Sequence, residues 1–287
     1  MAVEQALPVE HRGSVPVRRI QPATGLFRID LRELWRFREL EVFLIWRDIK
    51  SRYRQTVLGG TWAILRPLLS TVVFTVIFGG VAKIKPGGGL PYALFVLPGV
   101  VLWTYFSSAI SGGASSVVGN GALVTKAYFP RVHLVLAAVL APIIDFTLSL
   151  LVVVGVFAWY HHVPNWHVVL LPVFLALTVV FVLGLSLWLA PVTVRYRDVP
   201  FALPFVLQIW MFLTPIVYPT SIVPARFHWL LSINPFTALA AGGRWSLVGG
   251  APPGAAALAT SIGLSVALTL GGLVYFRRRE PSFPDYL

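Results

Sequence analysis

Few side chains in this sequence have the types and spacing that catalysis or metal binding requires. The chain holds 11 Asp and Glu residues and no cysteine, and it contains no P-loop, HExxH, GxSxG or paired-carboxylate pattern. His161, His162 and His167 could hold a transition metal, but no carboxylate lies near them in the sequence, and we favour polar roles at a membrane surface. We therefore expect no catalytic residue and no metal site, and the chain by itself cannot be a Walker-type ATPase.

Asp145 is a carboxylate in the middle of a long apolar run. An acid inside a membrane is costly, so it usually faces a polar partner or a wet cavity. Two interpretations follow: a structural hydrogen bond to a neighbouring helix, which we favour, and a role in transport. The sequence shows no series of such acids that would form a proton relay, which argues against a secondary transporter.

Basic residues gather in short segments beside the apolar runs. One segment, 119–131, mixes apolar and basic residues and suits a small helix that docks on a partner protein and stops at Pro130. A second is the cluster Arg195-Tyr196-Arg197-Asp198. A purely topological role, in which the cations hold these loops on one side of a membrane, explains both segments equally well.

The composition indicates that most of the surface faces lipid. The chain of 287 residues is 57% hydrophobic and 12% charged, with a mean hydropathy of +0.78, whereas soluble domains carry about 25% charged residues. Lys and Arg outnumber Asp and Glu by 23 to 11, which gives a net charge of +12. In a soluble protein that excess would suggest nucleic acid, but here the cations flank apolar runs, as membrane topology signals do. We expect contact with membrane lipid and none with nucleic acid.

The apolar runs predict an all-α integral membrane protein with about six spans of about 20 residues each. The runs are Trp62–Val81, Tyr92–Ile110, Val132–Trp159, Val168–Val192, Phe201–Val217 and Ala255–Phe276. The fifth carries Pro204 and Pro215 and should be kinked or broken. The stretch from Tyr218 to Gly250 is too polar and too rich in Pro and Gly for a span, so we expect short re-entrant helices there.

The distribution of cations predicts the orientation of these spans. Six spans place both termini on one side, and 19 of the 23 Lys and Arg residues fall on that side. The positive-inside rule therefore predicts a multi-pass protein with both termini in the cytoplasm. No cleavable signal peptide is visible at the N-terminus.

Four regions are expected along the chain. Residues 1–30 hold several prolines and little periodicity, and we expect a flexible cytoplasmic N-terminus. Residues 31–60 hold an amphipathic helix with tryptophan on its apolar face, for which we favour a place in the cytoplasmic membrane interface over packing as a soluble helix on the protein itself. Residues 61–276 form the transmembrane domain, and 277–287 form a cytoplasmic tail.

Several segments, taken in order, resemble the polysaccharide-exporting branch of the ABC-2 type permeases, which includes O-antigen, teichoic-acid and capsule exporters. They are 47–59 (RDIKSRYRQTVLG) with Trp62 and Pro67, Lys126 with Phe129-Pro130-Arg131, Arg195-Tyr196-Arg197-Asp198, Asn234-Pro235-Phe236 before Arg244-Trp245, and the tail Tyr275-Phe276-Arg277-Arg278-Arg279-Glu280-Pro281-Ser282-Phe283. No single segment is specific, but the ordered set covers nearly the whole chain after about residue 40. The chain departs from the family pattern at Pro284-Asp285-Tyr286, where relatives often have Ala-Asp and an aliphatic end.

The resemblance implies a half-transporter. Two copies of this chain would work with two copies of a separately encoded ABC nucleotide-binding subunit, and ATP and Mg²⁺ would belong to that partner, so this chain would need no cofactor. The loop Lys126–Arg131 would be a coupling helix, and residues 218–250 would form external gate helices. The residues implied in coupling to the ATPase are Lys126, Tyr128, Phe129, Pro130, Arg131, Arg195, Arg197 and Asp198.

The implied substrate is a polyprenyl-diphosphate-linked polysaccharide, such as O-antigen or teichoic acid, exported across the bacterial inner membrane. Its pyrophosphate needs cations at the cytoplasmic mouth; Arg47, Lys50, Arg52 and Arg54 could supply them, although contact with anionic phospholipid explains these residues equally well. Sugars stack on aromatic rings, so aromatic side chains should line the channel, with lipid contact as the alternative for each. The candidates are Phe74, Phe78, Trp210, Phe212 and Tyr218.

Three other functions stay open from the sequence. An ABC-2 exporter of a drug or a small lipid shares the fold and would not need a continuous aromatic channel. An intramembrane enzyme acting on polyprenyl lipids would need clustered catalytic acids, against which the low acid count argues. A passive channel or secondary carrier would work without an ATPase partner.

Overall fold

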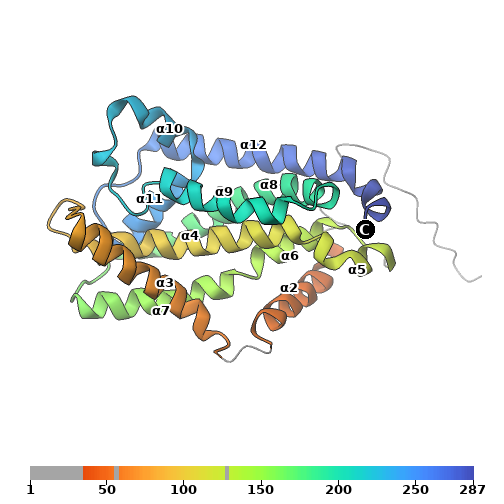
Figure 1. Ribbon diagram of the computed structural model, residues 1–287, viewed down its shortest axis with the longest axis horizontal. Helices are drawn as coiled ribbons and strands as arrows, with labels where there is room; N and C mark the ends of the chain where they lie inside the picture. The colour runs from red at the N-terminus through yellow and green to blue at the C-terminus, as the bar shows by residue number, and fades with distance from the viewer. Residues whose placement is uncertain (1–34, 55–57, 127–128) are drawn as a thin grey trace, which may run out of the picture.

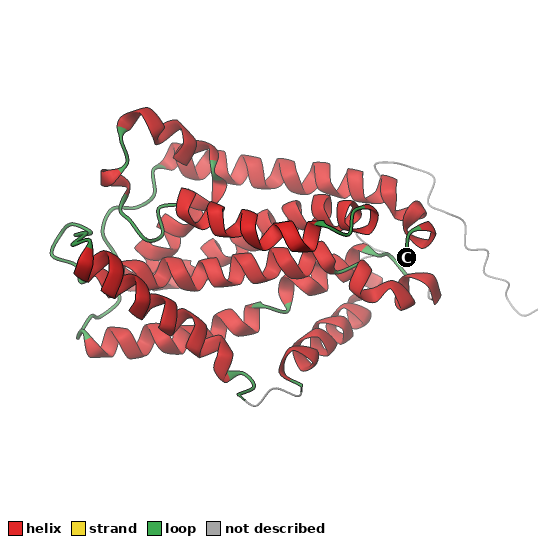
Figure 2. Ribbon diagram, viewed as in Figure 1, coloured by secondary structure: helices red, strands yellow, loops and turns green. Residues whose placement is uncertain are grey.

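The structure, a computed structural model, describes residues 35–54, 58–126 and 129–287, and the regular elements in those residues are all helical (Figures 1 and 2). The α-helices are α2 (Arg38–Tyr53), α3 (Thr61–Phe74), α4 (Tyr92–Ser115), α5 (Gly121–Lys126), α6 (Val132–Leu140), α7 (Ile143–Trp159), α8 (Leu171–Arg195), α9 (Val199–Leu213), α10 (His228–Ile233), α11 (Pro235–Val248) and α12 (Ala255–Arg279). A π-helical stretch, η1 (Thr75–Val81), prolongs α3, and short 3₁₀ helices η2 (Val118–Asn120), η3 (Trp166–Leu170), η4 (Thr220–Ile222), η5 (Ala225–Phe227) and η6 (Glu280–Asp285) lie at the ends of other elements. The predicted all-α fold is confirmed.

Within these residues, five helical stretches are long and apolar enough to cross a membrane. They are Thr61–Val81, Tyr92–Ser115, Val132–Trp159, Trp166–Arg195 and Ala255–Asp285. These stretches coincide with the first four and the last of the expected spans. In Figure 1 the long helices run roughly along the long axis of the molecule.

The expected fifth span is the shorter helix α9. Its 15 residues rise about 22 Å at about 1.5 Å per residue, whereas the hydrocarbon core of a bilayer is about 30 Å thick. The helix runs through Pro204 and ends two residues before Pro215, because a proline disfavours the helical conformation of the residue that precedes it. The chain then turns into the bundle, where Thr214 and Ile216 are fully buried.

The central helix of the bundle is α4. In its most apolar window 83% of the residues are buried, compared with 11% for α3 and η1, because α4 carries no charged residue and most of its faces are apolar, as is typical of a core helix. Phe106 of α4 makes ring contacts with Phe181 of α8, Trp210 of α9 and Phe236 of α11. One aromatic side chain thus joins four helices.

Pro142 divides the expected third span in two. Helix α6 ends at Leu140, and α7 begins at Ile143. Proline has no N–H to donate and its ring clashes with the preceding turn, which explains the break. The span keeps its expected limits, from Val132 to Trp159.

The stretch between α9 and α12 forms short helices instead of a span, as predicted. Arg244 of α11 holds it in place: the guanidinium donates to the carbonyl oxygen of Phe95 on α4 at 2.9 Å and to those of Pro215 and Ile216 at 3.1 and 3.0 Å. Pro215 and Ile216 follow the end of α9, where the chain has left the helix. Arg244 therefore ties α11 to α4 and to the chain that follows α9.

The two ends of the bundle differ in charge. In Figure 1, α5 and η6 lie at one end with the C-terminus, and α10 and α11 lie toward the other. The first end, which we call the basic end, carries many of the cations that lie in loops or in the last turns of the long helices. They include Lys126, Arg131, Arg195, Arg197, Arg277, Arg278 and Arg279.

Helix α2 lies beside the basic half of the bundle and packs on α6. Its core contact is Leu44, which is 1% exposed. Next to Leu44, Oε2 of Glu41 lies at hydrogen-bond distance, 2.6 Å, from Nδ1 of His133 on α6. The apolar side chains Trp35, Val42 and Trp46 are exposed. The helix thus presents one face to the protein and leaves an aromatic and aliphatic face that the described residues do not cover.

Candidate functional site

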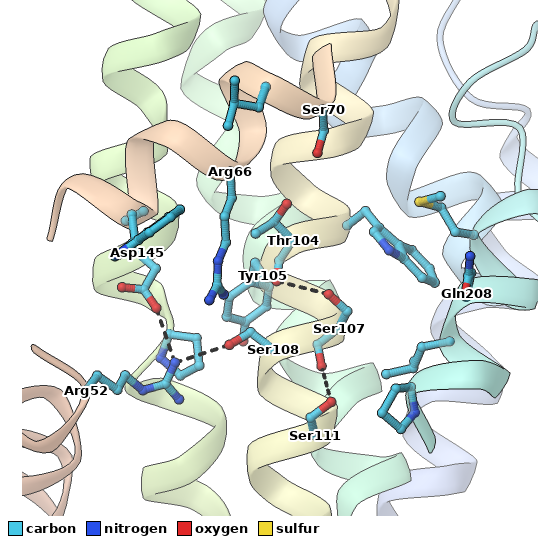
Figure 3. Close-up of a pocket in the computed structure, with 18 of the residues that line it drawn as sticks. Arg52, Arg66, Ser70, Thr104, Tyr105, Ser107, Ser108, Ser111, Asp145 and Gln208 are labelled. Carbon is cyan, nitrogen blue, oxygen red and sulfur yellow. Dashed lines mark hydrogen bonds and ion pairs between the residues drawn. The ribbon is translucent and has the colours of Figure 1, made fainter. Parts of the chain in front are cut away.

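A cavity of about 990 Å³ lies between α3, α4, α7 and α9, next to the end of α2. Figure 3 labels the polar side chains that line it, which come from all five helices. Polar groups inside an apolar bundle are costly unless they meet water, a partner or a ligand. A cavity with so many of them is therefore the strongest candidate for a site in this chain.

An ion pair between Arg52 and Asp145 closes the side of the cavity that faces α2. Nη1 of Arg52 lies 3.2 Å from Oδ2 of Asp145 and donates to Oγ of Ser108 at 3.1 Å. The hydroxyl of Tyr53 donates to the other carboxylate oxygen of Asp145. Burial and then the hydrogen bond to Asp145 raise the pKa of Tyr53. Asp145 therefore makes structural contacts with a neighbouring helix, which is the interpretation favoured from the sequence. It also forms part of the cavity wall.

Helix α4 contributes a row of hydroxyls to the cavity. Thr104, Ser107, Ser108 and Ser111 line it, and their spacing of three and four residues places them on one face of a helix. Three of these hydroxyls donate to carbonyls of their own helix: Thr104 to Val100, Ser107 to Thr104 and Ser111 to Ser107, at 2.8, 3.3 and 2.8 Å. Oxygen acceptors thus remain facing the cavity. The sequence analysis missed this row, although its helical spacing is visible in the second span.

A contact between the C-terminal tail and two loops organises the basic end. The backbone N–H of Arg131 donates to Oε1 of Glu280 at 3.0 Å, and its guanidinium donates to the carbonyl of Glu280 and, at 3.4 Å, to that of Val124 in α5. Arg197, from the loop before α9, donates to the carbonyl of Tyr286 at 3.4 Å. The tail therefore bridges the segment 119–131 and the cluster at 195–198.

The sequence profile of the family described as ABC-2 type transporter matches residues 40–248. The chain belongs to the ABC-2 type transporter family. The resemblance found in the sequence is confirmed, and the chain is a multi-pass membrane protein of a family of transport permeases that generally work with an ABC ATPase partner.

Individual relatives of the chain are named for O-antigen export and for polysialic acid transport. The O-antigen export system permease protein of Myxococcus xanthus is 31% identical over 257 residues, which cover 89% of this chain and 98% of the relative. The protein of the same name from Klebsiella pneumoniae is 26% identical over 206 residues, covering 70% and 77%. The polysialic acid transport protein of Escherichia coli is 22% identical over 244 residues, covering 83% and 92%.

The residues that the ABC-2 resemblance implied in coupling lie together at the basic end, apart from Tyr128, which is outside the described residues. Lys126 ends α5, Phe129 is buried, and Pro130 leads into Arg131 at the start of α6. Arg195 ends α8 and stacks over Tyr196, and Asp198 precedes α9. The sequence analysis gave the tail no role in this cluster, because a contact across 149 residues leaves no local pattern.

The four cations expected to bind pyrophosphate have different environments. Arg47 pairs with Asp48 at 2.9 Å, and Lys50 and Arg54 are exposed. Of the four, Arg52 lines the cavity, where it is paired with Asp145. Arg66, one of the 19 cations on the side predicted to be cytoplasmic, also lies in the cavity wall.

The five aromatic residues expected to line a channel lie outside the wall of this cavity. Phe74 and Phe78 contact each other on the continuous face of α3 and η1, and Trp210 donates from Nε1 to Asn234 at 3.0 Å. Tyr218 donates to the carbonyl of Phe212 at 2.8 Å. The aromatic residues of the cavity wall are Tyr53, Trp62, Trp103 and Tyr105.

The histidines show no metal site. His162 packs against Phe157, and His167 packs against Trp166 and Trp245. Within the described residues, no group of three or more His, Cys, Asp or Glu side chains is placed to hold a metal ion.

Proposed function

We propose that this chain is the transmembrane subunit of an ATP-driven exporter that moves a polyprenyl-diphosphate-linked polysaccharide, such as O-antigen or a similar envelope glycan, from the cytoplasm across the bacterial inner membrane. Two copies of the chain form the pathway, and two copies of a separate ABC subunit hydrolyse ATP. Both termini and the basic end lie in the cytoplasm. The polysaccharide exporters among the relatives support the substrate class.

The observation that carries this proposal is the polar cavity between α3 and α9. Arg66 and Gln208 are exposed there, and both helices also expose apolar residues, such as Val72 on α3 and Phe205 on α9. A polar wall open to lipid is costly, so a second copy packed on α3 and α9 covers it. The two cavities then face each other and form a hydroxyl-lined path that suits a sugar chain.

The two loops that the tail joins at the basic end form the surface on which the ATPase docks and which it moves. Segment 119–131 and the cluster at 195–198 are joined by the tail through Arg131 and Arg197. A force applied to either loop therefore reaches both. Helix α2, with its uncovered Trp and Val side chains, lies in the membrane interface beside them.

The test is ATP hydrolysis by the chain co-purified with the ABC ATPase encoded beside it, reconstituted in nanodiscs with and without polyprenyl-diphosphate-linked glycan. We expect a stable complex whose vanadate-sensitive hydrolysis is stimulated by the glycan lipid. A complex that responds to small amphiphiles and is indifferent to the glycan would replace this proposal with a drug or small-lipid exporter. Failure to bind any ABC ATPase would refute the coupled mechanism.

A further inference from the structure

The charges that the described residues bring to the cavity wall do not balance. These residues include two cations, Arg52 and Arg66, and one acid, Asp145. Asp145 is paired with Arg52 at 3.2 Å. Arg66 makes no hydrogen bond and no ion pair with any residue that the structure describes. Within the described part of the chain, the cavity therefore carries one positive charge without a counter-charge.

The position of Arg66 makes this charge costly. Arg66 lies five residues after the start of α3, inside a predicted membrane span. Figure 3 shows the side chain of Arg66 extending along the cavity toward Tyr105 and Ser108. The side chain is thus placed for a ligand within the cavity.

A hydroxyl group toward which Arg66 extends completes a site with a spare donor. On the opposite wall, Ser108 accepts a hydrogen bond from Arg52, so its own O–H is left to donate. Ser70, one helical turn further along α3, also lines the cavity but lies on the other side of Arg66 from Ser108. A guanidinium with a hydroxyl donor on the facing wall suits a tetrahedral oxyanion, because its fork matches two oxygens at once.

From this arrangement we infer that Arg66, with Ser108, binds the diphosphate at the lipid end of the substrate. The inference rests on the proposed export of a diphosphate-linked glycan. A polyanionic glycan would need cations repeated along its path, whereas the rest of the wall is neutral apart from the compensated Arg52–Asp145 pair. One uncompensated cation matches a single anionic group at one end of a chain.

The binding test uses farnesyl diphosphate and farnesol, which share a polyprenyl tail and differ in the anion. The permease–ATPase complex is placed in phosphatidylcholine nanodiscs without nucleotide, and the dissociation constants of both ligands are measured by scintillation proximity. We expect the wild-type complex to prefer the diphosphate about tenfold or more and Arg66→Gln to abolish that preference. Arg66→Lys should keep part of it, since lysine retains the charge without the fork.

The matched control is Lys85→Gln, which removes an exposed cation from the loop between η1 and α4. This variant should keep the full preference for the diphosphate. Basal ATP hydrolysis and the elution volume of the complex report on folding of each variant. An Arg66→Gln complex that folds and still prefers the diphosphate by the wild-type ratio would overturn the inference.

Two further measurements separate other sources of the anion. Phosphatidylglycerol that competes with farnesyl diphosphate at similar concentration would reassign Arg66 to phospholipid headgroups. An acidic oligosaccharide that competes as well as the diphosphate would reassign it to the glycan. If neither competes, the result supports the diphosphate of the lipid as the group that Arg66 binds.

Glycan-lipid stimulation of ATP hydrolysis distinguishes the inference from the proposed function. If the glycan lipid stimulates the wild type at a concentration about tenfold lower than Arg66→Gln needs, the result supports both the inference and glycan export. Equal stimulation of the two complexes would overturn the inference and leave glycan export standing. The remaining outcome is that no glycan lipid stimulates the wild-type complex, while Arg66→Gln still loses the binding of farnesyl diphosphate seen in the wild type. That outcome would refute glycan export and support Arg66 as a diphosphate site.

Discussion

Arg131 at the start of α6 and Glu280 in the C-terminal tail are joined by two hydrogen bonds across 149 residues of sequence. The backbone N–H of Arg131 donates to the Glu280 carboxylate at 3.0 Å, and the Arg131 guanidinium donates to the Glu280 carbonyl. The tail is thereby fixed to the segment that we propose contacts the ATPase.

Glu280→Ala should lower export more than ATP hydrolysis. The carboxylate holds the start of α6, and losing a charge-assisted hydrogen bond costs about 1–3 kcal/mol. We expect export per ATP to fall about fivefold or more while the complex still assembles. Glycan export and phosphate release are measured on the same proteoliposomes. Asp285→Asn, an exposed change in the same tail, is the control, and an unchanged export ratio in Glu280→Ala would contradict this role for the tail.

Asp145→Asn should destabilise the chain, because it leaves Arg52 without its acid. The pair is largely but not fully buried, with side chains 28% and 21% exposed, so we expect a loss of about 1–3 kcal/mol in place of the larger cost of a fully buried charge. Tryptophan fluorescence during thermal unfolding in detergent measures the change. The double variant Arg52→Gln with Asp145→Asn should recover part of the loss. Additive effects of the two changes would show that the pair is not coupled.

The docking of α2 on α6 should weaken as the pH rises. Burial raises the pKa of Glu41 above its ordinary 4.5, with the His133 contacts acting in the opposite direction. A raised carboxyl pKa means that the docked state retains a proton that the undocked state releases, so docking is strongest below the ordinary value and is lost as the pH passes the raised one. Glu41→Gln should remove this dependence.

The accessibility of position 44 measures this docking. The chain has no cysteine, so Leu44→Cys, at a site 1% exposed, reports on the release of α2 through its rate of thiol labelling. The rate is divided by that of Ser51→Cys at an exposed site on the same helix, which corrects for the pH dependence of the reagent. A ratio that does not rise between pH 5 and pH 8 would argue against the Glu41 contribution.

Arg244→Lys should loosen the short helices between α9 and α12. Lysine retains the charge but cannot donate to three carbonyls in the geometry of a guanidinium, and it leaves the oxygens of Phe95, Pro215 and Ile216 underused. We expect a lower apparent melting temperature, from a loss of about 1–3 kcal/mol. Arg226→Lys, at an exposed position, should leave the melting temperature unchanged. Equal effects of the two changes would show that Arg244 is not an anchor.

Most of the helical framework could be predicted from the sequence because hydropathy is a local property. The span from Tyr92 was predicted to end at Ile110 and runs to Ser115, a difference of about one turn. The span around α9 was predicted to reach Val217 but ends before Pro215, since the backbone constraint of that proline outweighs the apolar side chains that follow it.

The candidate site was less predictable because its parts meet only in the folded chain. Asp145 was visible as an unusual acid, but its partners Arg52 and Tyr53 come from a helix about 90 residues earlier. The sequence marks Arg66 only as one of many cations, whereas its environment among the described residues depends on the folded chain. The aromatic candidates follow from their positions on two expected spans, and at 13% aromatic residues such positions cannot distinguish rings that line a channel from rings that face lipid.

The shortness of α9 decides what the chain after it must do in a bilayer. The helix falls short of the hydrocarbon core by about 8 Å, the difference between a core of about 30 Å and a helix of about 22 Å. Beyond its end the chain lies inside the bundle, where Thr214 and Ile216 are buried. Backbone that leaves its helix at membrane depth is tolerated only where protein supplies its hydrogen bonds. Arg244 meets that requirement, because its guanidinium donates to the carbonyls of Pro215 and Ile216.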